Sequence, residues 1–372
     1  MPDGRDALTQ AHRIVVKIGS SSLTGSTGGH LVEEHLIALV DALAARYATG
    51  TQIVLVSSGA IAAGLGPLGL ERRPADLATQ QAAASVGQGV LASAYRHAFA
   101  DHAITAAQVL LTVGDVTRRA QYTNARRTLD RLLELGVVPV INENDTVATD
   151  EIRFGDNDRL AALVAHLVQA DALVLLTDVD ALYTDNPKEP GAQRIPVVDS
   201  RASLAEIRIG GTGSAVGSGG MQTKVEAAGI ASSAGIPTVL TSAGRVQQAL
   251  VGEDVGTLFL PDPSPMPSRT LWLRHATDPR GALVVDDGAV TALTRRHTSL
   301  LPAGITEVHG LFRDGDAVDV VALDGRRVAR GLTNYGSWEL PAMLGRSTKD
   351  LGADLGPEFE RAVIHRDDLV LY

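Results

Sequence analysis

Apolar residues in the first 260 positions form short β-branched runs, and longer stretches with helical spacing lie between them. Each short run predicts a buried strand. The predicted strands are residues 14–18, 53–56, 137–141, 172–176 and 237–240. The predicted helices are residues 33–48, 77–100, 123–135, 159–169 and 221–234. This alternation predicts a mainly parallel sheet with helices on both faces, a three-layer αβα sandwich. Ligands of such sheets bind at the carboxyl ends of the strands, so the loops there are the candidate sites.

The pattern changes near residue 260, where proline occupies every second position from Pro261 to Pro267. Because proline cannot continue a helix or a central strand, residues 261–274 are predicted to be a linker. Beyond it, short β-like runs alternate with turn signals such as Asp-Gly at 287–288 and 324–325. We therefore expect a first domain over residues 1–260 and a small, mostly β domain over residues 275–372.

Composition narrows the class of protein. The 372 residues are 45% hydrophobic and 20% charged, as in ordinary globular proteins. The net charge of −10 disfavours non-specific binding to nucleic acid or to anionic membranes. The absence of cysteine excludes disulfides, cysteine-ligated zinc and a thiol nucleophile. No apolar run resembles a signal peptide or approaches the length of a membrane span, so we expect a cytoplasmic protein.

Two loops after predicted strands contain small residues that suit ligand binding. Residues 17–22 (Lys-Ile-Gly-Ser-Ser-Ser) could present a cation and backbone N–H groups to a phosphate. A strand-end lysine that reaches water is an equally good explanation of this loop alone. Residues 57–60 (Ser-Ser-Gly-Ala) form a small-residue turn that lets the backbone approach a ligand closely, although such turns are common.

A third candidate site combines residues 142–145 (Asn-Glu-Asn-Asp) with residues 155–158 (Gly-Asp-Asn-Asp). Amides and carboxylates together can hold the ammonium and carboxylate groups of a substrate. Asn and Asp also favour turns and helix caps, which is the purely structural alternative. Two such clusters so close in sequence favour the binding interpretation.

A fourth candidate is the glycine-rich segment of residues 210–213 and 217–224. A Gly/Ser loop that opens a helix suits phosphate binding, and a surface loop is the alternative. Lys224 falls in the first turn of the predicted helix, where it opposes the helix dipole, so an anionic partner is expected. The chain has no Walker sequence, because Thr223 precedes Lys224. The glycines of residues 64–69 do not follow a strand, and no metal-ligand spacing occurs, so no protein-made metal site is expected.

With these loops the chain resembles the amino-acid kinase family. The matching segments are residues 15–20, 56–64, 139–145, 155–158, 176–178 and 219–224, in the order of the family. The pair of Asn/Asp clusters is most similar to the branch that phosphorylates the side-chain carboxylate of L-glutamate in proline synthesis. Residues after about 275 resemble a PUA domain. Ser57 and Ser218 stand where threonine is expected, and both retain the hydroxyl.

The resemblance implies a role for each matched residue. Lys17 and Lys224 would be catalytic and contact the transferred phosphoryl group, and Asp156 would hold both lysines. Glutamate would be bound by Ser58, Asp145 and Asn157. The implied ATP-binding residues are Lys17, Thr177, Asp178, Ser218, Gly219, Gly220, Met221, Gln222, Thr223 and Lys224.

The implied reaction needs charge neutralisation more than proton transfer. The acceptor carboxylate is already ionised at pH 7, so no general base is required. Its approach to the triphosphate is opposed by repulsion, which the lysines, loop N–H groups and Mg²⁺ would offset. The magnesium ion would be bound largely by substrate phosphates. Residues 206–220 are a candidate lid. Relatives imply feedback inhibition by proline, a dimer or tetramer, and contact with the next enzyme of the pathway.

Three alternatives stay open from the sequence. One is another amino-acid kinase that uses N-acetylglutamate or aspartate. Another is an RNA-binding protein that acts through the PUA-like region, although residues 275–372 contain 11 Lys and Arg against 15 Asp and Glu. A catalytically inactive regulatory homologue is disfavoured by the intact Lys17, Asp156 and Lys224.

Overall fold

The computed structural model describes residues 4–24, 31–116, 119–147, 157–199, 220–265, 273 and 279–372. The chain divides into two compact units, Met1–Met266 and Pro267–Tyr372. None of the described helices is long and apolar enough to cross a membrane.

The first unit is built on an eight-stranded sheet. Its strands are β1 (Arg13–Ile18), β2 (Gln52–Ser57), β3 (Thr105–Leu111), β4 (Val137–Glu143), β5 (Ala172–Thr177), β6 (Val197–Val198), β7 (Thr238–Ser242) and β8 (Thr257–Phe259). The order across the sheet is β3-β4-β2-β1-β5-β7-β8-β6. Every pairing is parallel except that of β7 with β8. The mainly parallel sheet predicted from the sequence is therefore confirmed.

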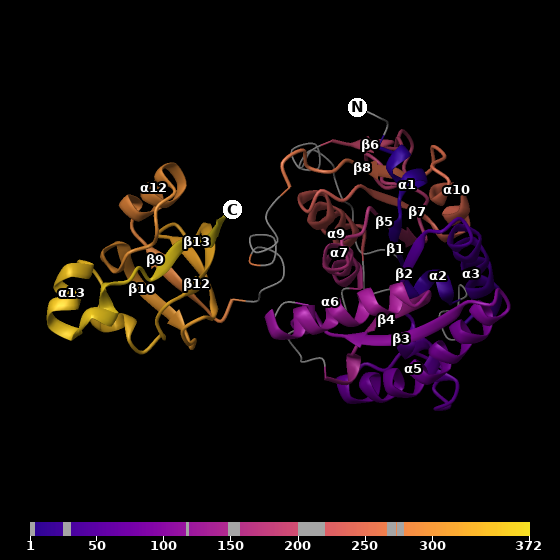
Figure 1. The fold of residues 1–372 in the computed structure, drawn as a ribbon, viewed down its shortest axis with the longest axis horizontal. Helices are drawn as coiled ribbons and strands as arrows, with labels where there is room; N and C mark the ends of the chain where they lie inside the picture. The colour runs from indigo at the N-terminus through magenta and orange to yellow at the C-terminus, as the bar shows by residue number, and fades with distance from the viewer. Residues whose placement is uncertain are drawn as a thin grey trace. The chain divides into compact units, whose positions relative to one another are not determined.

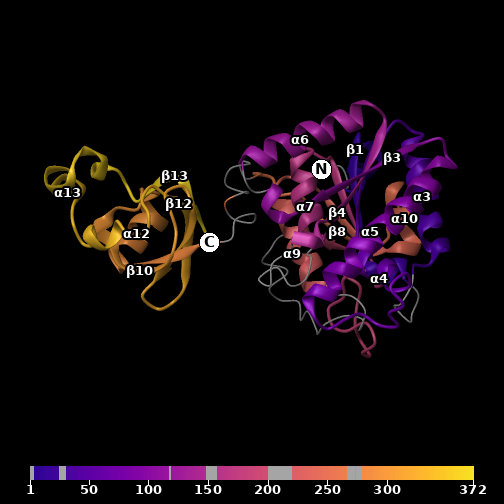
Figure 2. The ribbon, with the colours of Figure 1, turned by 90° about the horizontal axis from the view of Figure 1, so that it is seen from below.

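Helices cover both faces of this sheet (Figure 1 and Figure 2). One layer contains α1 (Asp6–Gln10), α3 (Glu33–Tyr47), α4 (Ala60–Leu65), α5 (Leu77–Ala100) and α10 (Val246–Leu250). The other layer contains α6 (Arg119–Glu134), α7 (Asn157–Leu167) and α9 (Met221–Ser233). The short helix α2 (Ser20–Leu23) follows β1, and one-turn 3₁₀ helices η1 (Val113–Val116), η2 (Asp145–Val147) and η4 (Ala243–Arg245) follow β3, β4 and β7. This arrangement is the expected αβα sandwich.

The alternation of side chains along β1 determines the face of the sheet to which Lys17 points. Successive residues of a strand point to opposite faces. Ile14, Val16 and Ile18 belong to the core that includes α3 and α5 residues. Lys17 therefore points to the opposite face, where α7 packs against β1.

The second unit is a smaller, mostly β structure. Its strands are β9 (Gly281–Val285), β10 (Ile305–Gly310), β11 (Ala317–Ala322), β12 (Arg327–Thr333) and β13 (Ile364–Leu371), in the order β10-β9-β11-β12-β13. Helices α12 (Asp287–Arg296) and α13 (Thr348–Leu355) and one-turn helices η5 (Pro302–Gly304), η6 (Leu340–Ala342) and η7 (Pro357–Glu360) connect them. Its own core includes Leu283, Val320, Tyr335 and Ile364. The expectation of a separate β-rich C-terminal domain is confirmed.

Candidate active site

The polar residues that follow the central strands lie at one edge of the sheet. Lys17 is near the end of β1, Ser58 follows β2, and Thr177 ends β5. Since β2 and β5 pair with β1 in parallel, these three strand ends are neighbours. The prediction that the candidate loops gather at the carboxyl edge of the sheet is therefore confirmed for the described residues.

A buried carboxylate joins the two lysines at this edge. Asp158 Oδ1 lies 2.5 Å from Lys17 Nζ, and Asp158 Oδ2 lies 3.2 Å from Lys224 Nζ. Thr223 donates a hydrogen bond from Oγ1 to Asp158 Oδ2 at 2.8 Å. The side chains of Lys17, Lys224 and Asp158 are only 5%, 8% and 2% exposed. Two cations are therefore held side by side, largely away from water.

The secondary structure explains how these residues meet. Asp158 is the second residue of α7 and Lys224 is the fourth of α9, and these two helices pack against each other. A carboxylate at a helix N-terminus is favoured by the dipole of that helix, whereas Lys224 opposes its own. The pairing with Asp158 compensates for that opposition.

Charge interactions outweigh burial at Asp158. Burial alone would raise its pKa, but Lys17, Lys224 and the hydrogen bond from Thr223 together hold the pKa at about 2. The pKa of Lys224 is lowered, chiefly by burial and further by Lys17, while Asp158 acts in the opposite direction. The carboxylate is therefore ionised throughout the physiological range.

The sequence placed the lysine-holding role on Asp156, and the structure places Asp158 in that position. Asp156 itself lies outside the described residues, as do Ser218, Gly219 and residues 206–219 of the candidate lid. Asp158 stands in the same Gly-Asp-Asn-Asp motif but was given no role. From the sequence this helix was predicted to begin at residue 159, whereas α7 begins at Asn157 and has Asp158 in its first turn.

An amide cluster lies next to the lysines. Asn157 donates from Nδ2 to Ser58 Oγ at 3.0 Å and to Asn142 Oδ1 at 3.3 Å. Asn142 Oδ1 also accepts a hydrogen bond from the backbone N–H of Glu143 at 2.8 Å. The remaining atoms, Asn142 Nδ2 and Asn157 Oδ1, are buried without a hydrogen-bond partner among the described residues. Buried polar groups normally have partners, so one free donor and one free acceptor mark a place for a polar ligand.

Asp145 lies just beyond this cluster, in η2 after β4. Burial raises its pKa to about 6, and the positive charge of Arg73 limits the rise. Arg73 is contributed by the segment between α4 and α5, and no sequence motif identified it. Gly59 follows Ser58 with a φ of +103°, a conformation that favours glycine and turns the chain from β2 into α4.

Comparison with known proteins identifies the family. The model of the amino acid kinase family matches residues 12–242, and that of the PUA domain matches residues 281–353. The chain belongs to the amino acid kinase family. A carbamate kinase from Giardia lamblia bound to AMP-PNP shares this kinase fold, with a TM-score of 0.51 and 18% identity over 68% of this chain and all of that one.

Relatives with higher identity match this kinase over its whole length. A glutamate 5-kinase from Salinispora arenicola is 61% identical over 99% of this chain and 100% of its own. A glutamate 5-kinase from Streptomyces avermitilis is 58% identical over 100% of this chain and 99% of its own. The similarity therefore includes both the kinase and the PUA regions.

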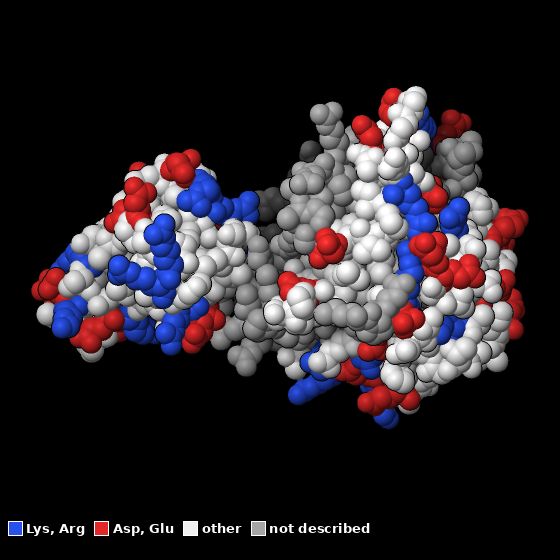
Figure 3. All heavy atoms as spheres, turned by 90° about the horizontal axis from the view of Figure 1, so that it is seen from above, with Lys and Arg blue, Asp and Glu red and all other residues white. Residues whose placement is uncertain are grey.

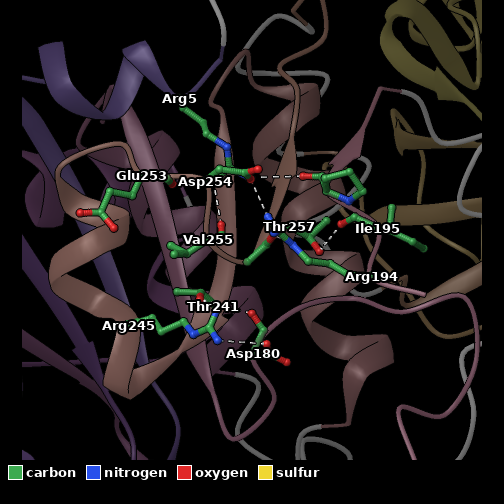
Figure 4. Close-up of polar contacts among 12 residues, drawn as sticks. Arg5, Asp180, Arg194, Ile195, Thr241, Arg245, Glu253, Asp254, Val255 and Thr257 are labelled. Carbon is green, nitrogen blue, oxygen red and sulfur yellow. Dashed lines mark hydrogen bonds and ion pairs between the residues drawn. The ribbon is translucent and has the colours of Figure 1, made fainter. Parts of the chain in front are cut away.

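The loop that leaves β5 carries the residues expected to contact the nucleotide of a kinase. Thr177 donates from Oγ1 to Asp178 Oδ1 at 2.9 Å. Farther along, Asp180 lies 3.7 Å from Arg245, a residue that follows β7 (Figure 4). The backbone N–H of Leu182 donates to Thr257 Oγ1 at 2.8 Å. The loop is thus anchored at Asp180 to the segment after β7 and at Leu182 to β8.

A second set of polar contacts in Figure 4 stabilises the edge of the sheet beyond this loop. Asp254 accepts from Arg194 at 2.6 Å and pairs with Arg5 at 2.8 Å. Arg5 also donates to the carbonyl of Val255 at 2.8 Å. These contacts connect the N-terminal segment and the β6 strand to the chain that enters β8, and they have a structural role.

The described residues do not form a protein-made metal site. No group of three or more His, Cys, Asp or Glu side chains among them is placed to hold a metal ion. Asp158, the most buried carboxylate of the site, is occupied by two lysines.

Proposed function

We propose that this protein transfers the γ-phosphoryl group of ATP to the γ-carboxylate of L-glutamate, forming L-glutamyl 5-phosphate in the first step of proline synthesis from glutamate. The observation that carries the proposal is the Lys17–Asp158–Lys224 cluster beside an amide cluster that has one donor and one acceptor without a partner among the described residues. The full-length glutamate 5-kinase relatives support the choice of substrate.

The lysines supply the charge that the reaction lacks. A carboxylate that attacks a triphosphate brings negative charges together, and the negative charge is spread over the transferred oxygens in the transition state. Lys17 and Lys224 are fixed in a buried site where electrostatic interactions are stronger than in water. Asp158 keeps both ammonium groups in position before the substrates bind, and Asp156, which was predicted to have this role, lies outside the described residues.

The amide cluster and Asp145 fit the remaining groups of glutamate. Asn142 can donate from Nδ2 to a carboxylate, and Asn157 can accept through Oδ1 from an ammonium group. Ser58 and Asn157 are held together by a hydrogen bond. The Asp145 carboxylate, once ionised, adds a second partner for the substrate ammonium group. Asn142 therefore joins Ser58, Asp145 and Asn157 as a glutamate-binding residue.

ATP would lie against the remaining loops. Thr177 and Asp178 would contact the nucleotide from the β5 side, and the α9 N-terminus would contact its phosphates. The proposed phosphate-binding segment at this N-terminus consists of Ser218, Gly219, Gly220, Met221, Gln222, Thr223 and Lys224. Mg²⁺ enters as part of the MgATP substrate. We also propose domain limits of 1–260 and 275–372 and a cytoplasmic location. Inhibition by proline and contact with the next enzyme of the pathway belong to the same proposal.

One surface of the first unit favours association with a second copy. Helix α5 has no charged residue from Leu77 to Tyr95, although Val86 and Val90 are each 38% exposed on it. It packs against β3, which has no further strand beside it in the described sheet and whose Leu110 is also 38% exposed. An open strand edge beside an uncharged helix is a surface that soluble monomers avoid. We therefore assign this surface to a homo-oligomer interface.

Trapping of the product tests the proposed activity. The purified protein is incubated with MgATP, hydroxylamine and L-glutamate, and the hydroxamate formed from the acyl phosphate is measured. N-acetylglutamate and aspartate are run in parallel. We expect a signal with glutamate alone and its loss in Lys224→Ala. A signal with another acid alone would reassign the substrate, and no signal with any acid would refute a carboxylate kinase.

RNA binding is not favoured by the charges of the second unit. Residues 275–372 contain 11 Lys and Arg against 15 Asp and Glu, and the face of this unit drawn in Figure 3 carries side chains of both signs. A gel-shift assay at low salt checks this point.

A further inference from the structure

Helix α5 contains two buried polar residues that no motif identified. Tyr95 is 0% exposed and Gln88 is 9% exposed, in a helix whose other buried residues are Ala, Gly, Leu and Phe. They are seven residues apart, so they lie on the same face two turns from each other. Each one reaches the end of a different strand at the candidate glutamate site.

Tyr95 reaches the end of β2. Its hydroxyl lies 2.9 Å from Ser57 Oγ, and Ser57 Oγ lies 3.0 Å from the carbonyl oxygen of Ser58. The single proton of Ser57 is needed for the Ser58 carbonyl, so Tyr95 is the donor to Ser57. Burial raises the pKa of Tyr95, which keeps this donor protonated. The chain of bonds ends on the peptide of Ser58, whose side chain accepts from Asn157.

Gln88 reaches the end of β4. It donates from Nε2 to the carbonyl of Glu143 at 3.3 Å, and its Oε1 accepts from Gln108 at 3.1 Å. The contact with Gln108 fixes the orientation of the Gln88 amide. The N–H of Glu143 in turn donates to Asn142 Oδ1. Gln88 thereby holds the backbone between Asn142 and Asp145.

We infer that Tyr95 and Gln88 are positioning residues for the acid-substrate pocket, each acting through the strand end that carries a substrate-binding residue. This inference rests on the proposed function, because it concerns the same pocket. Neither residue contacts the lysines or the loop after β5 among the described contacts, so their effect is expected on the acid and not on ATP. Helix α5 therefore sets the separation of Ser58 from the 142–145 loop.

Steady-state kinetics of Tyr95→Phe and Gln88→Met test the inference. Each substitution keeps most of the side-chain volume and removes one hydrogen bond to the strand end. We expect the KM for glutamate to rise about fivefold, the effect of one neutral hydrogen bond, and the KM for ATP to stay within about twofold. Ser57→Thr, which retains the hydroxyl, is expected to keep the wild-type KM.

Phe99→Leu is the matched control, because Phe99 is fully buried one turn along the same helix and has no polar group. It is expected to lower Tm without a selective change in the KM for glutamate. Tyr95→Phe combined with Ser57→Ala should raise that KM no more than the larger single effect. Equal changes in both KM values, additive effects, or an unchanged KM for glutamate would overturn the inference. If the wild type uses another acid, the same ratios are measured with that acid, so the two proposals fail separately.

Discussion

The Asp158→Asn substitution is the sharpest test of the charge arrangement. It removes a carboxylate that is 2% exposed and leaves Lys17 and Lys224 buried without the charge that bridges them. Removing one partner of a buried ion pair costs about 3–5 kcal/mol. Because two cations lose the same partner here, we expect a loss of stability near the upper end, about 5 kcal/mol.

The same substitution should also reduce turnover. The lysines are held by Asp158 at 2.5 and 3.2 Å, so without it their ammonium groups repel each other and move apart. A misplacement of about 1 Å can cost about 100-fold in rate. We expect kcat to fall at least about 100-fold, as measured by the hydroxamate assay on protein that remains folded by circular dichroism.

A second substitution separates the charge effect from simple disruption of packing. Lys224→Met in the Asp158→Asn background removes one of the two cations that lose the Asp158 carboxylate, so urea unfolding should show recovery of part of the lost stability without recovery of activity. Asp156→Asn is the comparison within the same motif, and we expect a smaller loss of stability from it. The reasoning would be refuted by an Asp158→Asn variant within about 1 kcal/mol of wild type, or by no recovery in the double variant.

Three further predictions follow from the described contacts. The pKa of Asp145 is raised to about 6 in the folded protein, so folding favours the neutral carboxyl group. The contribution of Asp145 to stability is therefore present below pH about 4 and lost as the pH rises through 6. Below pH 6 the neutral acid cannot pair with an ammonium group, so the KM for glutamate should rise there, and Asp145→Asn should flatten that profile. Gly87→Ala would place a Cβ 1.7 Å from the carbonyl oxygen of Ala60, and calorimetry should show a loss of about 3 kcal/mol as α4 and α5 are forced apart. Val90→Glu should dissociate the oligomer in sedimentation experiments, whereas Leu135→Glu, at a residue 61% exposed outside α5 and β3, should not.

The buried central strands could be predicted from the sequence because their surroundings make them continuously apolar. All six residues of β5 are buried, as are the last five of β1 and β2. Strand β3 was not predicted, because it lies at the sheet edge and its first six residues alternate irregularly between exposed and half-buried positions. Strands β6 and β8 were also missed, since two and three residues are too few to show a period.

Only those parts of the candidate site that lie within single loops could be predicted from the sequence. The motifs placed Lys17, Ser58, Asn157 and Lys224 correctly at one edge, because the carboxyl ends of parallel strands meet there.

Which carboxylate of the Gly-Asp-Asn-Asp motif faces the lysines depends on how α7 packs against β1 and α9, and a motif does not contain that information. The same limit applies to Gln88 and Tyr95, which act on the site from a helix whose sequence is otherwise that of ordinary core packing. The proposed substrate-binding residues follow strands or lie in the first turns of α7 and α9, whereas Gln88 and Tyr95 lie in the interior of a helix packed against the sheet. Sequence motifs therefore identify the first group and leave the second to be found from the structure.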